Sequence, residues 1–170
     1  MKKIDLNDSI KFIGNKAFGV DFNSNKTMIL EVTSLPKNLK SIGDYAFYNG
    51  GNNITIKEIP ENVETIGTWA FYGCPNLGIE NFNVKTIKAA AFYDSGTNVN
   101  TINLGNKAET IAYSKTSSFD RAFERYGISG NIYFTIDTSS PFYSTVYLAN
   151  ELSPEDLGIN AISVSEVVGG

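Results

Sequence analysis

A short motif that returns along the chain sets the strongest limit on its fold. The motif is a hydroxyl or aromatic residue, isoleucine, usually glycine, two variable residues, alanine and phenylalanine. Copies occupy residues 12–18, 41–47, 65–71 and 86–92, and a fifth starts at Thr110-Ile111 and reaches Ala122-Phe123 after an insertion. Units this short cannot bury their own apolar face, so neighbouring units must stack and share one continuous core.

Apolar positions also recur upstream of each motif. One lies three residues before each isoleucine (Ile10, Leu39, Val63, Val84, Ala108), and another lies further back (Leu6, Leu35, Ile59, Phe82, Leu104). Proline follows Leu35 and Ile59, where a strand should stop because proline has no N–H to donate. We expect a short strand to end at this second position and to pair in parallel with its equivalents. The Ile-Gly-x-x-Ala-Phe stretch is then expected to turn, with glycine easing the turn and alanine beside phenylalanine packing a short helical turn against the sheet.

These residues carry a family resemblance. The pattern Leu35-Pro36-x-x-Leu39-x-x-Ile42-Gly43-x-x-Ala46-Phe47, repeated from Ile59-Pro60 to Phe71, resembles the BspA-like leucine-rich repeat over about residues 4–125. The resemblance implies an α/β solenoid of short parallel strands and short helical turns, usually part of a bacterial surface protein concerned with adhesion or binding. Lys88 replaces the glycine and the fifth unit is interrupted, so less regular curvature is expected towards the C-terminus.

We assign residues 1–125 to the solenoid, with about five units, and residues 126–170 to an irregular C-terminal cap of the same domain. The first unit already carries Ile4, Leu6 and Ile10 at core positions, which predicts self-association through the N-terminal end. The expected elements nearer the C-terminus are a helix from Ser118 to Arg125 stopped by Gly127, a final strand over 132–136, a helix opened by Ser140-Pro141 (although 143–148 would also suit a strand), a short turn from Ser153 to Gly158 and a β-prone stretch over 161–168.

Composition excludes several functions. The net charge is −4 with no basic stripe, which argues against nucleic acid as a partner. No run of 18 apolar residues occurs, and polar residues follow Met1-Lys2-Lys3, so we expect no membrane insertion and no export signal in the chain as given. The chain has no histidine, which removes histidine-based nucleophile systems and histidine-ligated zinc. We therefore expect no catalytic residues, no metal and no cofactor.

Two residue types need a choice between packing and chemistry. Cys74, the single cysteine, sits three residues after Phe71 at a repeat position and has no basic neighbour in sequence, so we interpret it as a buried side chain and not as a reactive thiol. The glutamates Glu58, Glu61, Glu64 and Glu80 suggest the paired carboxylates of a glycosidase. They recur with the repeat at positions expected to face solvent, which favours a solvated surface.

Three tyrosines each follow a core phenylalanine: Tyr48, Tyr72 and Tyr93. Equivalent positions of stacked units form a row, so these rings should line one side of the solenoid. A half-buried packing row is the simpler interpretation, and an aromatic ladder for sugars or a partner protein is the alternative.

The strand before each second apolar position indicates where a partner could bind. Strict alternation would turn Thr33, Lys57 and Glu80 inward, which would be costly for the two charged side chains. Val32, Ile56 and Ile79 are apolar instead, so one extra residue per strand, as in a bulge, should let these point inward. The outward pairs are then Thr33-Ser34, Lys57-Glu58 and Glu80-Asn81, on the expected concave face, where Lys57 and Glu80 could form an ion pair between neighbouring strands about 4.8 Å apart.

The sequence therefore predicts a non-enzymatic binding or adhesion module of a bacterial surface or secreted protein. Its ligand would be a protein or a glycan, and the partner-binding residues would be Thr33, Lys57, Glu58, Glu80 and Asn81. A structural spacer within a larger protein is the alternative, and a carbohydrate-active enzyme is a third hypothesis. Cell-surface or secreted localisation follows from the family resemblance alone.

Overall fold

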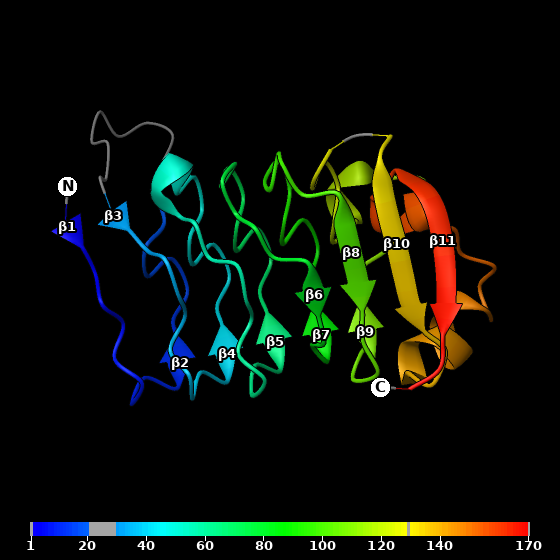
Figure 1. Ribbon diagram of the computed structural model, residues 1–170, viewed down its shortest axis with the longest axis horizontal. Helices are drawn as coiled ribbons and strands as arrows, with labels where there is room; N and C mark the ends of the chain where they lie inside the picture. Colours follow the sequence, from blue (N-terminus) through cyan, green and yellow to red (C-terminus); the bar gives the residue numbers. More distant parts are fainter. Residues whose placement is uncertain (1, 21–29, 129, 170) are drawn as a thin grey trace.

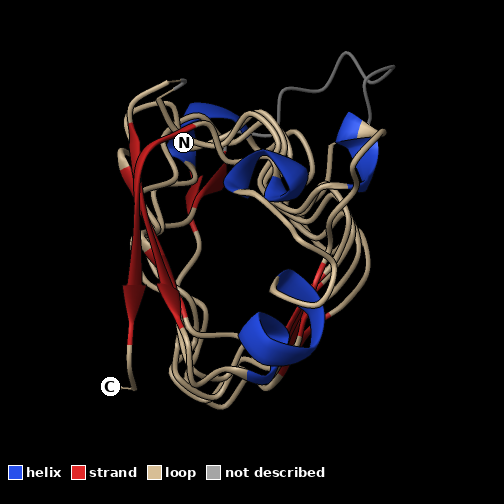
Figure 2. Cartoon of the chain, turned by 90° about the vertical axis from the view of Figure 1, so that its right-hand side faces the viewer, coloured by secondary structure: helices blue, strands red, loops and turns tan. Residues whose placement is uncertain are grey.

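The chain winds into a stack of coils with parallel sheets on its walls (Figure 1). The computed structural model describes residues 2–20, 30–128 and 130–169. One wall holds a five-stranded sheet, and the other a four-stranded sheet. Figure 2 shows the long strands of the second sheet and the short strands of the first on opposite sides of the coil.

The five-stranded sheet is built from two-residue strands. They are β2 (Phe12–Ile13), β4 (Ser41–Ile42), β5 (Thr65–Ile66), β7 (Thr86–Ile87) and β9 (Thr110–Ile111). Each isoleucine pairs with the isoleucine of the next unit, so the sheet follows the sequence repeat in register. β-Branched residues suit such a half-buried strand.

The position of the five-stranded sheet shows that the turn was predicted too early in each unit. The isoleucines were expected where the chain turns, yet they form strands, and the turn begins only after the glycine. On the opposite wall, β3 (Leu30–Glu31) pairs with β1 (Lys2–Lys3), and a bridge from Val32 to Ile54 continues that ladder. No strand includes Leu35 or Ile59 in the described part of the chain. The predicted strand end is confirmed at the equivalent residues Phe82 and Leu104, which close β6 (Asn81–Phe82) and β8 (Thr101–Leu104).

The glycines of the motif serve close approach and not left-handed backbone. A Cβ built on Gly43 would lie 2.6 Å from the backbone nitrogen of Asn15, and one on Gly67 would lie 2.5 Å from that of Asp44. The left-handed conformation falls two residues later instead, at Lys16, Tyr45, Trp69 and Ala90. Hydrogen-bonded turns, and not the expected short helical turns, carry the Ala-Phe stretch in these four units.

A ladder of phenylalanine rings fills the core. Phe18, Phe47, Phe71, Phe92 and Phe123 stack with successive centroid distances of 5.4, 5.1, 5.4 and 5.6 Å. Ile42, Ile66 and Ile87 are at most 1% exposed beside it, as the repeat predicts. The helix expected from Ser118 to Arg125 is wrong, since only a 3-10 turn, η2 (Ser118–Asp120), forms before the chain turns. An α-helix here would displace Phe123, whose ring stacks nearly parallel on Phe92.

The C-terminal residues extend one wall and close the end of the other. In the four-stranded sheet β10 (Ile132–Asp137) lies between β8 (Thr101–Leu104) and β11 (Ala161–Val167), with β6 (Asn81–Phe82) at the far edge. The predicted strand over 132–136 and the β-prone stretch are confirmed, although β11 and not β10 is the last strand. The remaining helical pieces are η1 (Gly51–Asn53), η3 (Tyr143–Tyr147) and η4 (Pro154–Leu157).

The helix and the short turn predicted for the cap both form. η3 continues the helical turn opened by Pro141, where the hydroxyl of Ser140 accepts the N–H of Tyr143 at 3.1 Å, which settles the helical alternative for this stretch. η4 starts with a reciprocal cap between Ser153 and Asp156 and ends at Gly158, whose φ is +86°. Backbone N–H groups of Ser114 and Phe123 donate to the carbonyls of Asp156 and Leu157, so this segment occupies the place where another unit would turn.

Candidate functional site

The predicted outward pairs lie at the surface. Thr33-Ser34, Lys57-Glu58 and Glu80-Asn81, which we call the polar row, are all exposed, whereas Val32, Ile56 and Ile79 are fully buried. The burial pattern inferred from the three-residue spacing is therefore confirmed. The three buried side chains belong to the continuous core, which holds the backbone of the polar row in place.

The polar row borders two hollows. Thr33, Lys57 and Glu58 line one of about 670 Å³, together with Ser34, Leu35, Lys37, Thr55 and Pro60. Lys57 and Glu80 line a second of about 480 Å³, together with Thr55, Pro75, Asn76, Leu77, Gly78, Asn98 and Val99. Lys57 thus lines both hollows. Among the described residues, Lys37 is the other cationic side chain at the first hollow.

The predicted ion pair between Lys57 and Glu80 does not form. The three ion pairs among the described residues join Lys85 to Glu109, Arg121 to Glu124 and Arg125 to Asp94. The backbone explains the difference, because the N–H of Gly78 donates to Ile56 at 2.9 Å and so places Gly78 beside Lys57. A Cβ on Gly78 would lie 3.3 Å from Cγ of Lys57, so the lysine stem crosses a position without a side chain.

Asn103 extends the polar row by one more strand. Its side-chain amide donates to the side-chain oxygen of Asn81 at 2.9 Å, across the paired strands β8 and β6. This residue was not predicted from the sequence. The signal was present, because Leu104 repeats Phe82 and the residue before each is asparagine.

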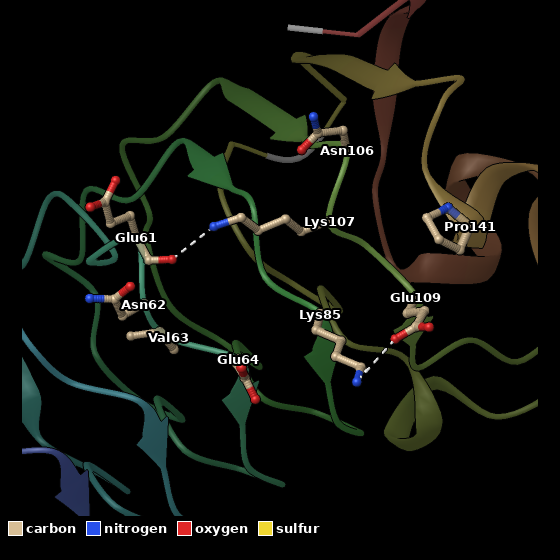
Figure 3. A pocket seen from close by; sticks show the side chains of 9 residues that line it. All are labelled: Glu61, Asn62, Val63, Glu64, Lys85, Asn106, Lys107, Glu109 and Pro141. Carbon is tan, nitrogen blue, oxygen red and sulfur yellow. Dashed lines mark hydrogen bonds and ion pairs between the residues drawn. The ribbon is translucent and has the colours of Figure 1, made fainter.

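A third hollow lies at a corner of the coil (Figure 3) and was not predicted. It encloses about 390 Å³ between Glu61, Asn62, Val63, Glu64, Lys85, Asn106, Lys107, Glu109 and Pro141. Both lysines are already engaged, Lys85 with the Glu109 carboxylate at 3.4 Å and Lys107 with the backbone carbonyl of Glu61 at 2.9 Å. Glu58, Glu61, Glu64 and Glu80 are exposed, as expected for a solvated surface.

The tyrosine row forms as predicted. Tyr48 and Tyr72 stack at 4.9 Å, Tyr72 and Tyr93 lie 5.9 Å apart, and all three are half-buried. Phe119, from η2, continues the row against Tyr93 at 5.6 Å. Trp69 packs beside it, 5.2 Å from Tyr72 and 5.3 Å from Tyr93. Phe119 was missed because its place depends on the insertion in the fifth unit.

Comparison with known families agrees with this architecture. The sequence profile of the BspA type leucine-rich repeat region matches residues 1–123 in six copies. The chain belongs to this family. No curated protein and no solved structure gives a significant match to it.

The six copies of the BspA-type profile end at the core ring Phe123, close to the boundary proposed at residues 125 and 126. β10 nevertheless joins the repeat sheet through four residue pairs with β8. The residues after the BspA-type repeats therefore share a sheet with them. The division of the chain into a solenoid and a cap stays a prediction, and the sheet continues across the proposed boundary.

Cys74 is a core residue of these BspA-type repeats. It is fully buried, and its thiol donates to the carbonyl of Phe47 at 3.4 Å. Burial raises the pKa of the Cys74 thiol to about 12, so the nucleophilic thiolate is suppressed near neutral pH. Burial likewise raises the pKa of Tyr126, whose hydroxyl donates to the carbonyl of Ile79. Both groups serve packing, as the sequence predicts for Cys74.

No group of three or more histidine, cysteine, aspartate or glutamate side chains is arranged to hold a metal ion within residues 2–20, 30–128 and 130–169. Within the same ranges, no helix is both long and apolar enough to cross a membrane.

Proposed function

We propose that this chain is a non-enzymatic binding module of a bacterial surface or secreted protein. Membership of the BspA type leucine-rich repeat family supports a repeat protein with a binding or adhesion role. The ligand is a protein or a glycan, and the polar row is its contact surface, with Thr33, Lys57, Glu58, Glu80 and Asn81 as the binding residues.

The observation that carries the proposal is that the exposed side chains of the polar row stand on backbone anchored by buried neighbouring residues. Each outward pair follows a fully buried residue, Val32, Ile56 or Ile79, so its position is set by the core. A partner then meets groups whose backbone does not have to be ordered on binding, which lowers the entropic cost of association. Lys57 is central because it reaches two hollows and has no carboxylate partner among the described ion pairs.

A capture experiment tests the proposal. The immobilised chain is exposed to surface proteins and polysaccharides from candidate host and bacterial sources, and the retained molecule is identified and titrated. Lys57→Glu should weaken its binding at least tenfold, or about 1.4 kcal/mol. Lys11→Glu is the matched control, since Lys11 is an exposed lysine outside the polar row.

The two alternatives give different results. A structural spacer retains nothing, which would overturn the binding proposal. A carbohydrate-active enzyme releases reducing ends from a panel of polysaccharides, whereas a binding module leaves them intact. Equal loss of binding in both lysine variants would indicate general charge attraction and would reject the polar row.

A further inference from the structure

Two edge strands of the same wall lie at opposite ends of the coil. β1 is an edge of the two-stranded sheet and β11 an edge of the four-stranded sheet, and Figure 1 shows them at the two ends of the long axis. β11 has seven residues and contains neither proline nor lysine, two residues that commonly protect an edge strand from pairing. It is therefore a long template to which another strand can add.

The hydrogen bonds between β10 and β11 show which backbone groups of β11 face outward. The carbonyl of Val167 accepts the N–H of Thr138 at 2.7 Å, and the register of the two strands is regular from Tyr133 onwards. Successive residues of a parallel strand direct their backbone groups to alternate sides. The N–H and carbonyl groups of Val164 and Glu166 therefore point away from β10, towards the free edge.

β1 presents the complementary edge. The N–H of Ile4 donates to the carbonyl of Glu31 at 3.2 Å, so the backbone groups of Lys3 point away from β3. Pairing is parallel at both ends of this wall. Because the strands of a solenoid wall run in one direction, a second copy placed in line brings its β1 alongside β11 in parallel orientation.

The apolar core is incompletely covered at both edges. Val164 pairs with the buried Phe134 and so lies on the core-facing side of the sheet, yet it is 47% exposed. At the other end Ile4, Leu6 and Ile10 pack against the core and are only partly buried. Stacking in line brings these apolar side chains together, so that the core continues from one copy into the next.

Charge favours contact between unlike ends over contact between like ends. Residues 1–20 contain four lysines and two aspartates, a net side-chain charge of +2, whereas residues 126–170 contain five acidic residues and no lysine or arginine, a net charge of −5. Lys3 and Glu166, on the two edge strands themselves, are both exposed. Opposite ends therefore attract, while pairing of two β11 strands would bring two acidic segments together.

We propose that a second copy of this chain docks its first unit on β11, so that copies stack head to tail. β1 of one copy adds a parallel strand to β11 of the other, and the two partly covered core faces close on each other. The contact joins two different surfaces, so every assembly keeps a free end and can grow into an open chain. No residue of the polar row lies on β1 or β11, so this inference is independent of the proposed binding function.

Sedimentation velocity of the full chain, from micromolar to millimolar concentration, measures the association. We expect dimers, trimers and longer species whose proportion rises with concentration, because a head-to-tail contact does not close. A chain that stays monomeric at millimolar concentration, or one that stops at a dimer, would overturn the proposal.

Two variants block one end each. Lys3→Pro removes the N–H that faces the incoming strand and leaves the bond from Ile4 to Glu31 in place. Val164→Lys places a charge on the uncovered core edge of β11. Each variant alone should associate at least about tenfold more weakly than the parent. An equimolar mixture of the two should form a dimer and nothing larger, because each variant contributes its one intact end.

Controls separate a blocked end from a damaged fold. Lys88→Glu changes an exposed lysine of a middle unit, and Phe119→Lys charges an exposed ring that packs on Tyr93. Both should associate as the parent does, and all four variants should keep its circular dichroism spectrum.

The pattern of loss identifies the contact. Association kept by Lys3→Pro and lost in Val164→Lys would indicate pairing of two β11 strands, and the reverse would indicate contact between two N-terminal ends. Either pattern, or an equimolar mixture that stays monomeric, would overturn head-to-tail stacking.

Discussion

Replacing Phe71 by alanine tests the phenylalanine ladder directly. Phe71 is 0% exposed and stacks on Phe47 and Phe92 at 5.1 and 5.4 Å, with ring planes within 8° of parallel. Loss of the buried ring surface costs about 2 kcal/mol, and loss of two ring pairs adds about 1 kcal/mol each. The sum of about 4 kcal/mol lies within the range measured for phenylalanine-to-alanine changes in protein cores.

Equilibrium urea unfolding measures this loss. Tryptophan fluorescence and far-ultraviolet circular dichroism should give the same transition, and the thermal midpoint of Phe71→Ala should fall by about 8–16 °C for a chain of this size. Phe71→Leu keeps most of the apolar volume but removes both stacked ring pairs, so we expect about half the loss.

Phe12→Ala is the control, since Phe12 is 66% exposed and should cost under about 0.5 kcal/mol. A loss below about 1.5 kcal/mol for Phe71→Ala, or one equal to that of Phe12→Ala, would refute the ladder as a main source of stability.

Three further predictions concern the two ends and the core. Phe12→Glu should reduce concentration-dependent light scattering, because it places a charge on the exposed edge strand β2, whereas unchanged scattering would exclude this edge from self-association. Val164→Lys should likewise suppress association through β11, an edge strand on which Val164 is 47% exposed, and equal scattering would count against that edge. Cys74 should react with a thiol reagent only on unfolding. Its raised pKa stabilises the fold fully below pH 9 and progressively less as pH rises towards 12, so Cys74→Ala should flatten the alkaline loss of stability, and an unchanged profile would contradict this.

The sequence predicted which residues are buried better than where the strands lie. Val32, Ile56 and Ile79 could be placed in the core because strict alternation would instead bury the charged side chains of Lys57 and Glu80. Strand positions depend on inter-unit hydrogen bonds, which have no counterpart in a hydrophobic pattern. Ile42 and Ile66 therefore proved to be strand residues where a turn was expected.

The predicted parts of the site are those that follow from the repeat, and the missed parts depend on backbone pairing or on an insertion. Tyr48, Tyr72 and Tyr93 occupy equivalent positions in successive units, so their row follows from the repeat. The predicted ion pair between Lys57 and Glu80 was wrong because the backbone places Gly78, and not Glu80, beside Lys57. Phe119 and the corner hollow depend on an insertion and on the return of residues after 140, which no repeat position encodes.

The unlike ends of the coil give its unfolding a direction. At one end η4 supplies the carbonyls that accept the N–H groups of Ser114 and Phe123. At the other, Ile4, Leu6 and Ile10 are only partly buried. Because each unit contacts mainly its neighbours, opening should start at the first unit and travel along the ladder. Amide exchange should therefore be fastest in residues 2–20 and slow towards the middle units, and a pull on both termini should peel the domain from its N-terminal side.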